Sequence, residues 1–492
     1  MFMHLKYHIN WGLLLTAYKI VNRKRLRAML MNYRDIFQNI LPPERLHFEG
    51  DIMEFHSRDE TEDLHFRPGV VAEPVSTTEV SALIRMAFEH EVPVTAGGAR
   101  TGLSGGALAI KGGLVLSLRR MNKILLIDEK NHQVIVEPGV ITEVLQNAVS
   151  EKCLFYAVDP ASQGTCTIGG NIAENSGGPR AVKYGVTKDW VLNLEVVLPD
   201  GRVIETGANT LKNSTGYNLT GLIVGSEGTL GVVTRATLKL LPLPRFQALM
   251  LVPFTSVTNA CKTVSEIFRA GAMPSAVEFM EHDAMVLTQE FTGNKEISID
   301  PNDKAYLLIE VDGFDESEIM PQCERILSVL ENNGSGEVLF AQSDSEKEKL
   351  WFLRRRVGEA VKAASIYKEE DTVVPRGMLP DLMLAVKSIG EKYGFRSICY
   401  GHAGDGNLHI NILRDDLSDQ VWSEELNKAI RELFDVVVAM GGTLSGEHGI
   451  GLVQKDFMDI AFSPDELSVL KMIKNGFDPK GIMNPGKMFP NS

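Results

Sequence analysis

The chain has few cysteines, and none is spaced as a metal or redox motif. Five cysteines are scattered through 492 residues, and no two form a CxxC pair. This pattern argues against a disulfide scaffold, a zinc ribbon or an iron–sulfur cluster, and it favours a reducing compartment such as the cytoplasm. A GxGxxG segment after a strand is also missing, which argues against a Rossmann dinucleotide site.

Positive charge and membrane-spanning length are also in short supply. The chain has 50 basic and 64 acidic residues, a net charge of −14, and no basic stretch interleaved with aromatics, so nucleic acid is not an expected partner. The apolar segment 9–21 is interrupted by Lys19 and is too short to span a bilayer. Two interpretations stay open. The segment is either an extension upstream of a start at Met29 or Met31, or an anchor whose basic cluster 22–25 contacts the inner face of a membrane.

The length and the local patterns predict an α+β protein with more than one domain. A chain of 492 residues is too long for one ordinary core. Segment 75–88 has helix-capping residues followed by apolar positions at helical spacing, and 194–204 is a hairpin around Asp200-Gly201. Two prolines in 241–244 predict the end of regular structure. We therefore expect four parts, with limits 1–60, 61–243, 244–450 and 451–492.

The part after residue 244 alternates strand and helix patterns. Strands are expected at 306–311 and 397–400, and helices at 321–331 and 344–362. This order predicts an antiparallel sheet with helices on one face.

Three segments rich in small residues suggest a binding loop system for a large anion-bearing cofactor. Segment 96–106 follows the β-like residues 92–95, and the others are 162–178 and 225–231. Glycine allows sharp turns that aim bare amide groups at an anion. Each segment alone could be an ordinary turn, whereas the three together are long enough to wrap a dinucleotide.

Two histidines and a later carboxylate form a candidate metal site. Gly404-Asp405-Gly406 supplies a turn between His402 and His409, which can thus face one point, and Glu447 can complete a two-histidine, one-carboxylate set. Such a histidine pair alone is more often structural than metal-binding. The glycine segments in the same chain shift the balance to a metal site beside a cofactor.

The order of these motifs resembles one flavoprotein family. The glycine segments with 183–185, 198–201 and 225–234 resemble the FAD-binding domain of the vanillyl-alcohol oxidase type. Segments 401–402, 445–449 and 484–487 resemble its D-2-hydroxyacid dehydrogenase branch, which holds D-lactate dehydrogenases, D-2-hydroxyglutarate dehydrogenases and the flavin subunit of glycolate oxidase. The resemblance runs from Arg67 to Phe489 and implies a vanillyl-alcohol-oxidase-type FAD-binding domain plus an antiparallel-sheet cap domain.

The resemblance implies a cofactor and a metal. FAD is expected to be bound without a covalent link, because Ala99-Arg100 occupies the loop where many relatives carry a histidine attached to FAD. Arg100 beside a phosphate implies either an added charge contact or a shifted loop. The metal on His402, His409 and Glu447 is expected to be zinc, with manganese or iron as alternatives. The residues placed against FAD are Ala96, Gly97, Gly98, Thr101, Gly102, Ser104, Gly105, Pro160, Ile168, Gly169, Asn171, Asn175, Gly178, Tyr184, Glu227, Gly228, Val232 and Asn484.

The resemblance also assigns catalytic roles. Arg354, selected by a Trp-x-x-Arg pattern, is expected to bind the substrate carboxylate, and Asn411 to face the substrate. The substrate α-carbon would deliver a hydride to the flavin, while His448 removes the hydroxyl proton with the help of the metal. Gly358 stands where D-2-hydroxyglutarate enzymes tend to carry a hydroxyl side chain, which favours D-lactate or glycolate.

The expected electron acceptor follows from the cofactor-binding motifs that the sequence lacks. With neither a nicotinamide site nor iron–sulfur cysteines, the electrons are expected to pass to a quinone, a cytochrome, an electron-transfer flavoprotein or an iron–sulfur subunit. A dimer is one expected assembly. Two other functions stay open: a flavin-dependent transferase of the alkylglycerone-phosphate synthase type, and a flavoprotein that only passes electrons within a complex.

Overall fold

A computed structural model describes residues 32–61 and 63–490. The predicted anchor at 9–21 and the candidate starts Met29 and Met31 lie outside the described residues. Within them, no helix combines the length and the apolar character needed to cross a membrane.

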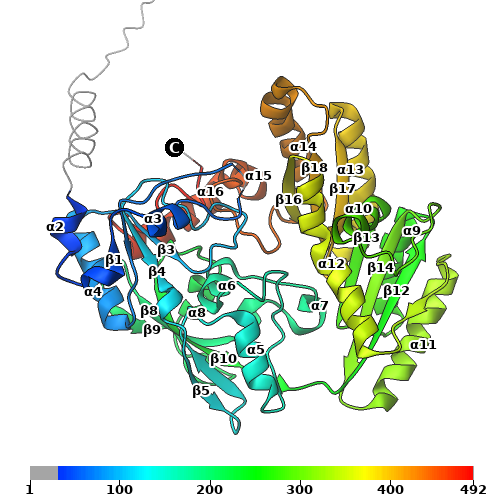
Figure 1. Cartoon of the computed structure of the whole chain (residues 1–492), viewed down its shortest axis with the longest axis horizontal. Helices are drawn as coiled ribbons and strands as arrows, with labels where there is room; N and C mark the ends of the chain where they lie inside the picture. Colours follow the sequence, from blue (N-terminus) through cyan, green and yellow to red (C-terminus); the bar gives the residue numbers. More distant parts are fainter. Residues whose placement is uncertain (1–31, 62, 491–492) are drawn as a thin grey trace, which may run out of the picture.

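Two sheets, which sit mainly on the left in Figure 1, make up the first half of the chain. A four-stranded sheet has the order β1-β2-β4-β3 and a five-stranded sheet the order β5-β6-β10-β8-β9. The strands are β1 Leu46–His47, β2 Val70–Ala72, β3 Val94–Gly97, β4 Leu114–Ser117, β5 Ile124–Asp128, β6 Gln133–Val136, β8 Val191–Val197, β9 Val203–Glu205 and β10 Val232–Lys239. The helices are α2 Tyr33–Phe37, α3 Asp51–Phe55, α4 Thr77–His90, α5 Thr142–Ser150, α6 Ile168–Glu174, α7 Ala181–Tyr184 and α8 Leu219–Ile223.

Local sequence signals account for several of these elements. The helix expected at 75–88 is α4, which begins after Ser76 because the Ser76 side chain accepts a hydrogen bond from the Glu79 N–H. The hairpin around Asp200-Gly201 is confirmed, since β8 and β9 pair antiparallel. The expected end of regular structure within 241–244 falls after Pro242: Leu241–Pro242 form the short strand β11, which pairs with β7, Leu154–Phe155, and the next strand begins at Phe246.

A seven-stranded sheet occupies the second half, on the right in Figure 1. Its order is β15-β12-β14-β13-β17-β18-β16, and every neighbouring pair is antiparallel. The strands are β12 Phe246–Phe254, β13 Ala276–Glu281, β14 Ala305–Gly313, β15 Leu339–Phe340, β16 Tyr367–Val373, β17 Arg396–Gly401 and β18 Asn407–Leu413. The helices are α9 Val257–Arg269, α10 His282–Thr292, α11 Glu316–Asn332, α12 Asp344–Ala364, α13 Leu379–Tyr393 and α14 Leu426–Ala439.

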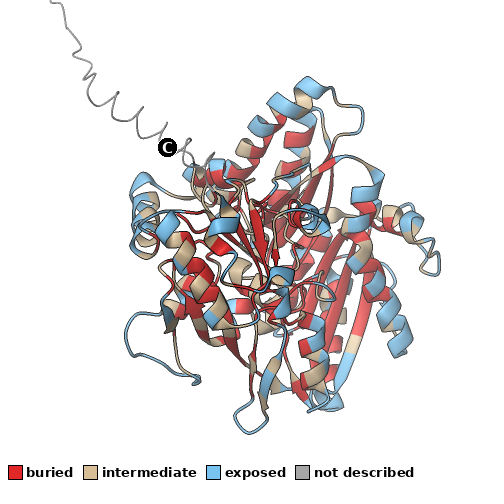
Figure 2. Cartoon of the chain, turned by 60° about the vertical axis from the view of Figure 1, so that its left-hand side comes forward, coloured by how far each residue is buried: buried red, intermediate tan, exposed pale blue. Residues whose placement is uncertain are grey.

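Helices cover both faces of this sheet, so the expectation of helices on one face was wrong. Met250 and Val252 of β12 pack into a core with α9, α11, α13 and α14, whereas Leu249 and Leu251 pack with α10 and α12. Successive residues of a strand point to opposite faces, and both sets of β12 residues are apolar. The interior strand β14 is buried along its whole length, and Figure 2 shows the strands buried and the helices exposed on their outer sides.

The remaining helical segments are short or lie near the C-terminus. The 3-10 turns are η1 Pro43–Arg45, η2 Leu118–Arg120, η3 Thr187–Asp189, η4 Arg376–Met378 and η6 Lys455–Phe457, and a π-helical turn, η5, covers Val421–Glu425. The last helices are α15 Met458–Ala461 and α16 Pro464–Phe477. After them, Met483 forms a parallel bridge with Val94 of β3, which returns the chain to the first half. The four domain limits drawn from the sequence stay a prediction.

Candidate active site

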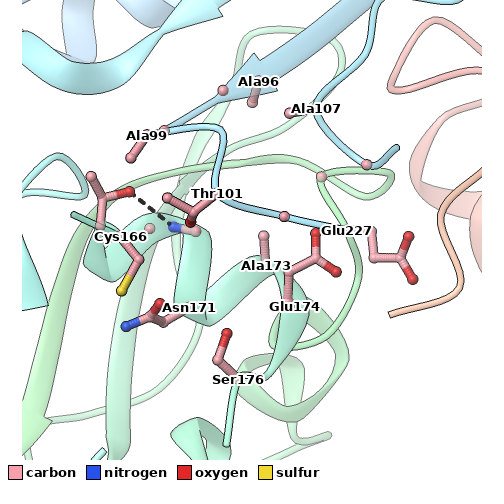
Figure 3. A pocket seen from close by; sticks show the side chains of 18 of the residues that line it. Ala96, Ala99, Thr101, Ala107, Cys166, Asn171, Ala173, Glu174, Ser176 and Glu227 are labelled. Carbon is pink, nitrogen blue, oxygen red and sulfur yellow. Dashed lines mark hydrogen bonds between the residues drawn. The ribbon is translucent and has the colours of Figure 1, made fainter. Parts of the chain in front are cut away.

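The three glycine segments come together around one pocket (Figure 3). An ideal Cβ at Gly102 or Gly228 would meet no atom within 4 Å, so the bare backbone faces open space at both positions. Gly98 packs close to the second segment instead, because a Cβ there would lie 2.3 Å from Thr167 Oγ1. These features fit the cradle expected for FAD. The predicted FAD residues that line the pocket are Ala96, Gly97, Gly98, Thr101, Gly102, Pro160, Gly169, Asn171, Glu227, Gly228 and Val232.

The other predicted FAD residues lie outside this lining. Asn484 donates to the Gly106 and Glu227 carbonyls, which ties the C-terminal segment to the pocket walls. The Tyr184 hydroxyl donates a hydrogen bond to Asp312, which lies on β14 of the seven-stranded sheet. The residues not in the lining are Ser104, Gly105, Ile168, Asn175, Gly178, Tyr184 and Asn484.

Arg100 turns its side chain to the protein backbone. It has a left-handed backbone conformation, with φ of +67°, and its guanidinium donates to the Arg58 and Ala107 carbonyls. Burial lowers the pKa of Arg100 to about 10. Arg100 lines the pocket, and its Nη1 is buried with no hydrogen-bond partner among the described residues. The choice between an added charge contact and a shifted loop stays a prediction.

The predicted metal ligands meet beside the pocket, whose lining includes Glu447. His402 and His409 flank the Gly404–Gly406 turn between β17 and β18, and both are buried. His402 Nε2 lies 3.4 Å and His409 Nε2 3.5 Å from Glu447 Oε1. Two imidazole nitrogens converging on one carboxylate oxygen fit the donor set of a divalent metal.

Two further carboxylates lie behind these imidazoles, and the one of Glu278 is hydrogen-bonded to His402. His402 Nδ1 lies 2.8 Å from Glu278 Oε2 on β13, and His409 Nδ1 lies 3.0 Å from Glu369 Oε1 on β16. Carboxylates behind metal-binding histidines fix the ring orientation and the tautomer, so this arrangement also fits a metal site. Although burial opposes charge on His402, the carboxylates of Glu278 and Glu447 raise its pKa well above the usual value.

Asp371 holds the segment that carries Glu447 and His448. Its Oδ2 accepts hydrogen bonds from Ser445 Oγ and from the N–H groups of residues 446, 447 and 448, at 2.8–3.0 Å. Burial opposes ionisation of Asp371, but the two nearby histidines and these N–H groups lower its pKa far below the usual value. His448 lies near the same carboxylate, with Nδ1 4.0 Å from Asp371 Oδ2. It lines the FAD pocket together with Glu447.

The two other predicted catalytic residues lie next to this cluster. Arg354 Nη2 lies 2.6 Å from Glu278 Oε2, and its Nε is buried without a hydrogen-bond partner among the described residues. Asn411 donates to the Ile398 carbonyl, while its Oδ1 is buried and also has no partner there. Arg355 is exposed and Arg356 pairs with Glu359, so one arginine of the three faces inward. Unpaired buried groups of this kind fit a polar substrate.

Sequence reasoning missed Glu278, Glu369 and Asp371. Each lies on a strand beside β17 or β18, and Asp371 stands opposite His409 in the sheet register. One signal was available, since Glu369 and Asp371 are two residues apart and thus share a face of a strand. Glu174 in the pocket wall was also missed.

Comparisons with known proteins agree with this geometry. Residues 68–207 match the model of an FAD binding domain, and 243–488 match that of the FAD linked oxidases, C-terminal domain. The chain is 39% identical over 437 residues to glycolate oxidase subunit GlcD of Bacillus subtilis, covering 88% of this chain and 92% of that protein. It is 36% identical over 456 residues to a D-lactate dehydrogenase of Anaerostipes hadrus, covering 91% and 95%.

Solved structures share the fold at low sequence identity. A p-cresol methylhydroxylase structure has a TM-score of 0.77 at 17% identity, covering 92% of this chain and 95% of that one. An alkyldihydroxyacetonephosphate synthase has a TM-score of 0.72 at 18% identity, covering 92% and 86%. These likenesses confirm the α+β fold with a vanillyl-alcohol-oxidase-type FAD-binding domain. The matching family models and the relatives together show that the chain is an FAD-linked oxidoreductase and belongs to the FAD-linked oxidase family.

Proposed function

We propose that the protein oxidises a short D-2-hydroxyacid, D-lactate or glycolate, to the 2-oxoacid, and passes the electrons to an acceptor other than a nicotinamide. The observation that carries this proposal is the continuity of the two sites: Glu447 and His448 line the FAD pocket and also belong to the histidine cluster. The relatives named glycolate oxidase subunit and D-lactate dehydrogenase support the substrate class.

His448 and Arg354 divide the work on the substrate. The imidazole of His448 accepts the hydroxyl proton. Burial disfavours the charged form of this imidazole, but the carboxylates of Asp371, Glu369 and Glu447 raise the pKa of His448 above the usual value. The Nε of Arg354, which has no hydrogen-bond partner among the described residues, can donate to the substrate carboxylate. Asn411, whose Oδ1 also has no partner there, faces the substrate. When bound, FAD supplies the two-electron acceptor, and a divalent metal on His402, His409 and Glu447 supplies a Lewis acid.

The space near Gly358 supports a short substrate. A Cβ at Gly358 would lie 3.0 Å from the Tyr400 hydroxyl, so a larger residue there would press on Tyr400. The Tyr400 ring stacks on His409 at 5.2 Å, and the Arg354 guanidinium lies over it at the same distance. Tyr400 thus fills the volume beside the guanidinium, which supports a substrate without a second carboxylate.

Anaerobic reduction of the flavin tests the proposal. D-lactate or glycolate should bleach the oxidised flavin absorbance, while L-lactate should not and D-2-hydroxyglutarate should act more slowly. No bleaching by any 2-hydroxyacid would contradict the proposal and leave a transferase, which shares the fold, as the better candidate.

A further inference from the structure

Glu174 is a carboxyl group in the FAD pocket for which the proposed reaction has no use. It ends α6 and lines the pocket beside Glu227, and the two side chains lie next to each other in Figure 3. Its Oε2 is buried and has no hydrogen-bond partner among residues 32–61 and 63–490. A buried polar atom without a partner calls for a ligand or a special protonation state.

The two neighbouring carboxyl groups are not equivalent. Glu227 accepts hydrogen bonds from the Ile450 N–H at 2.8 Å and from the Gly451 N–H at 2.7 Å, one on each oxygen. Both groups converge on Gly449, since a Cβ there would lie 2.2 Å from Glu174 Oε2 and 3.0 Å from Glu227 Oε1. Two carboxylates this close do not both ionise easily, and the backbone donors stabilise the charge on Glu227.

The cation nearest in effect, Lys487, is engaged elsewhere, since its Nζ donates to Asn484 Oδ1 at 2.7 Å and to two backbone carbonyls. Arg100 donates to two backbone carbonyls through Nε and Nη2, and its Nη1 has no partner among residues 32–61 and 63–490. The other charged group that faces this region is Asp59, another acid. Burial, with Glu227 adding to it, raises the pKa of Glu174 well above the usual value, and burial lowers that of Lys487 to about 7.

We infer that Glu174 is a neutral carboxylic acid whose O–H donates a hydrogen bond to FAD, and that this bond helps to set the reduction potential of the flavin. Glu174 lies in the part of the pocket near the proposed metal site, because its carboxyl group lies against Gly449, which is two residues from the proposed ligand Glu447. A charged Glu174 would lower the potential by opposing negative charge on the reduced flavin, whereas a neutral donor stabilises that charge.

Two variants of the FAD-loaded protein test this inference. Glu174→Gln keeps a neutral donor of the same shape, so FAD affinity should stay within threefold, and the flavin midpoint potential should move by less than about 30 mV, a tenfold change for a two-electron couple. Glu174→Leu removes the donor and should weaken FAD binding tenfold or more, or lower the potential by more than that amount.

Infrared difference spectra between the oxidised and reduced flavoprotein identify the proton directly. The protein should show a carboxylic acid C=O band that is lost in Glu174→Gln and kept in the control Glu129→Gln, whose glutamate is exposed. Absence of such a band, together with a potential raised by more than about 30 mV in Glu174→Gln, would overturn the inference, because it would mean that the native side chain is ionised. If the leucine variant does not fold, the glutamine variant and the spectra still decide.

Discussion

Replacing Asp371 by asparagine should damage the metal cluster while FAD stays bound, because the glycine segments of the pocket do not contact Asp371. Asp371 Oδ2 accepts from four donors of residues 445–448, and its Oδ1 accepts from Asn407 Nδ2 at 2.7 Å. An asparagine has one acceptor oxygen and one NH₂ group. Whichever way the amide turns, its NH₂ faces a donor, either Asn407 or the four groups of the 445–448 segment.

The expected cost follows from the number of bonds affected. In the milder orientation, one bond to a charged acceptor is lost, and the others lose their charge assistance, which together costs about 2 kcal/mol or more. The cost falls on the segment that positions Glu447 and His448. We therefore expect metal content to fall and the rate of flavin reduction by D-lactate or glycolate to drop about thirtyfold.

Metal analysis, FAD absorbance and stopped-flow flavin reduction check this prediction. Asp416→Asn is the matched control, since Asp416 is exposed. The double variant Asp371→Asn, Asn407→Asp should recover part of the loss, because the carboxylate gained from the second substitution can accept from the new amide. Recovery should be incomplete, since Asn407 Nδ2 also donates to the Thr372 carbonyl. Metal content and rate within twofold of the native values in the single variant would refute the reasoning.

Five other outcomes are expected. His409→Ala should lower metal content and turnover while FAD stays bound, and full activity of this variant without metal would remove the metal from the mechanism. Arg354→Lys loses the planar fork and should raise KM, at a cost of about 2 kcal/mol in kcat/KM, whereas His448→Ala should lower kcat with FAD and metal retained. Acid precipitation should release FAD into solution, and colour that stays on the polypeptide would show a covalent link. Burial lowers the pKa of His56 from 6.5 to about 4, so the unfolded chain binds more protons at this residue, and the contribution of His56 to stability should fall by about 3 kcal/mol from pH 7 to pH 4. Urea unfolding of His56→Gln should show a smaller loss.

Local signals predicted the parts of the site that are close in sequence. The turn at 404–406 was visible because glycine and aspartate mark it, and the antiparallel register then places Tyr400 opposite His409. The capped helix α4 and the hairpin at Asp200-Gly201 were visible for similar reasons. In each case the residues that determine the structure lie within a few positions of one another.

Partners distant in the sequence could not be found this way. Glu278 reaches His402 because β13 pairs with β17, and no local pattern specifies which strands become neighbours. The second layer of helices was missed for a related reason. A strand with apolar residues on both faces, such as β12, indicates burial on both sides, but β12 was not among the strands predicted from the sequence.

Segment 445–451 links the two halves of the molecule. Asp371, from the seven-stranded sheet, binds the N–H groups of residues 446–448, and Glu227, from the first half, binds those of 450 and 451. Glycines allow the close approach, because a Cβ at Gly451 would lie 2.2 Å from the Ser104 carbonyl oxygen. Two buried carboxylates thus fix one short segment from opposite sides. Since Glu447 and His448 lie between them, the position of the proposed base relative to the FAD pocket depends on both halves keeping their contact.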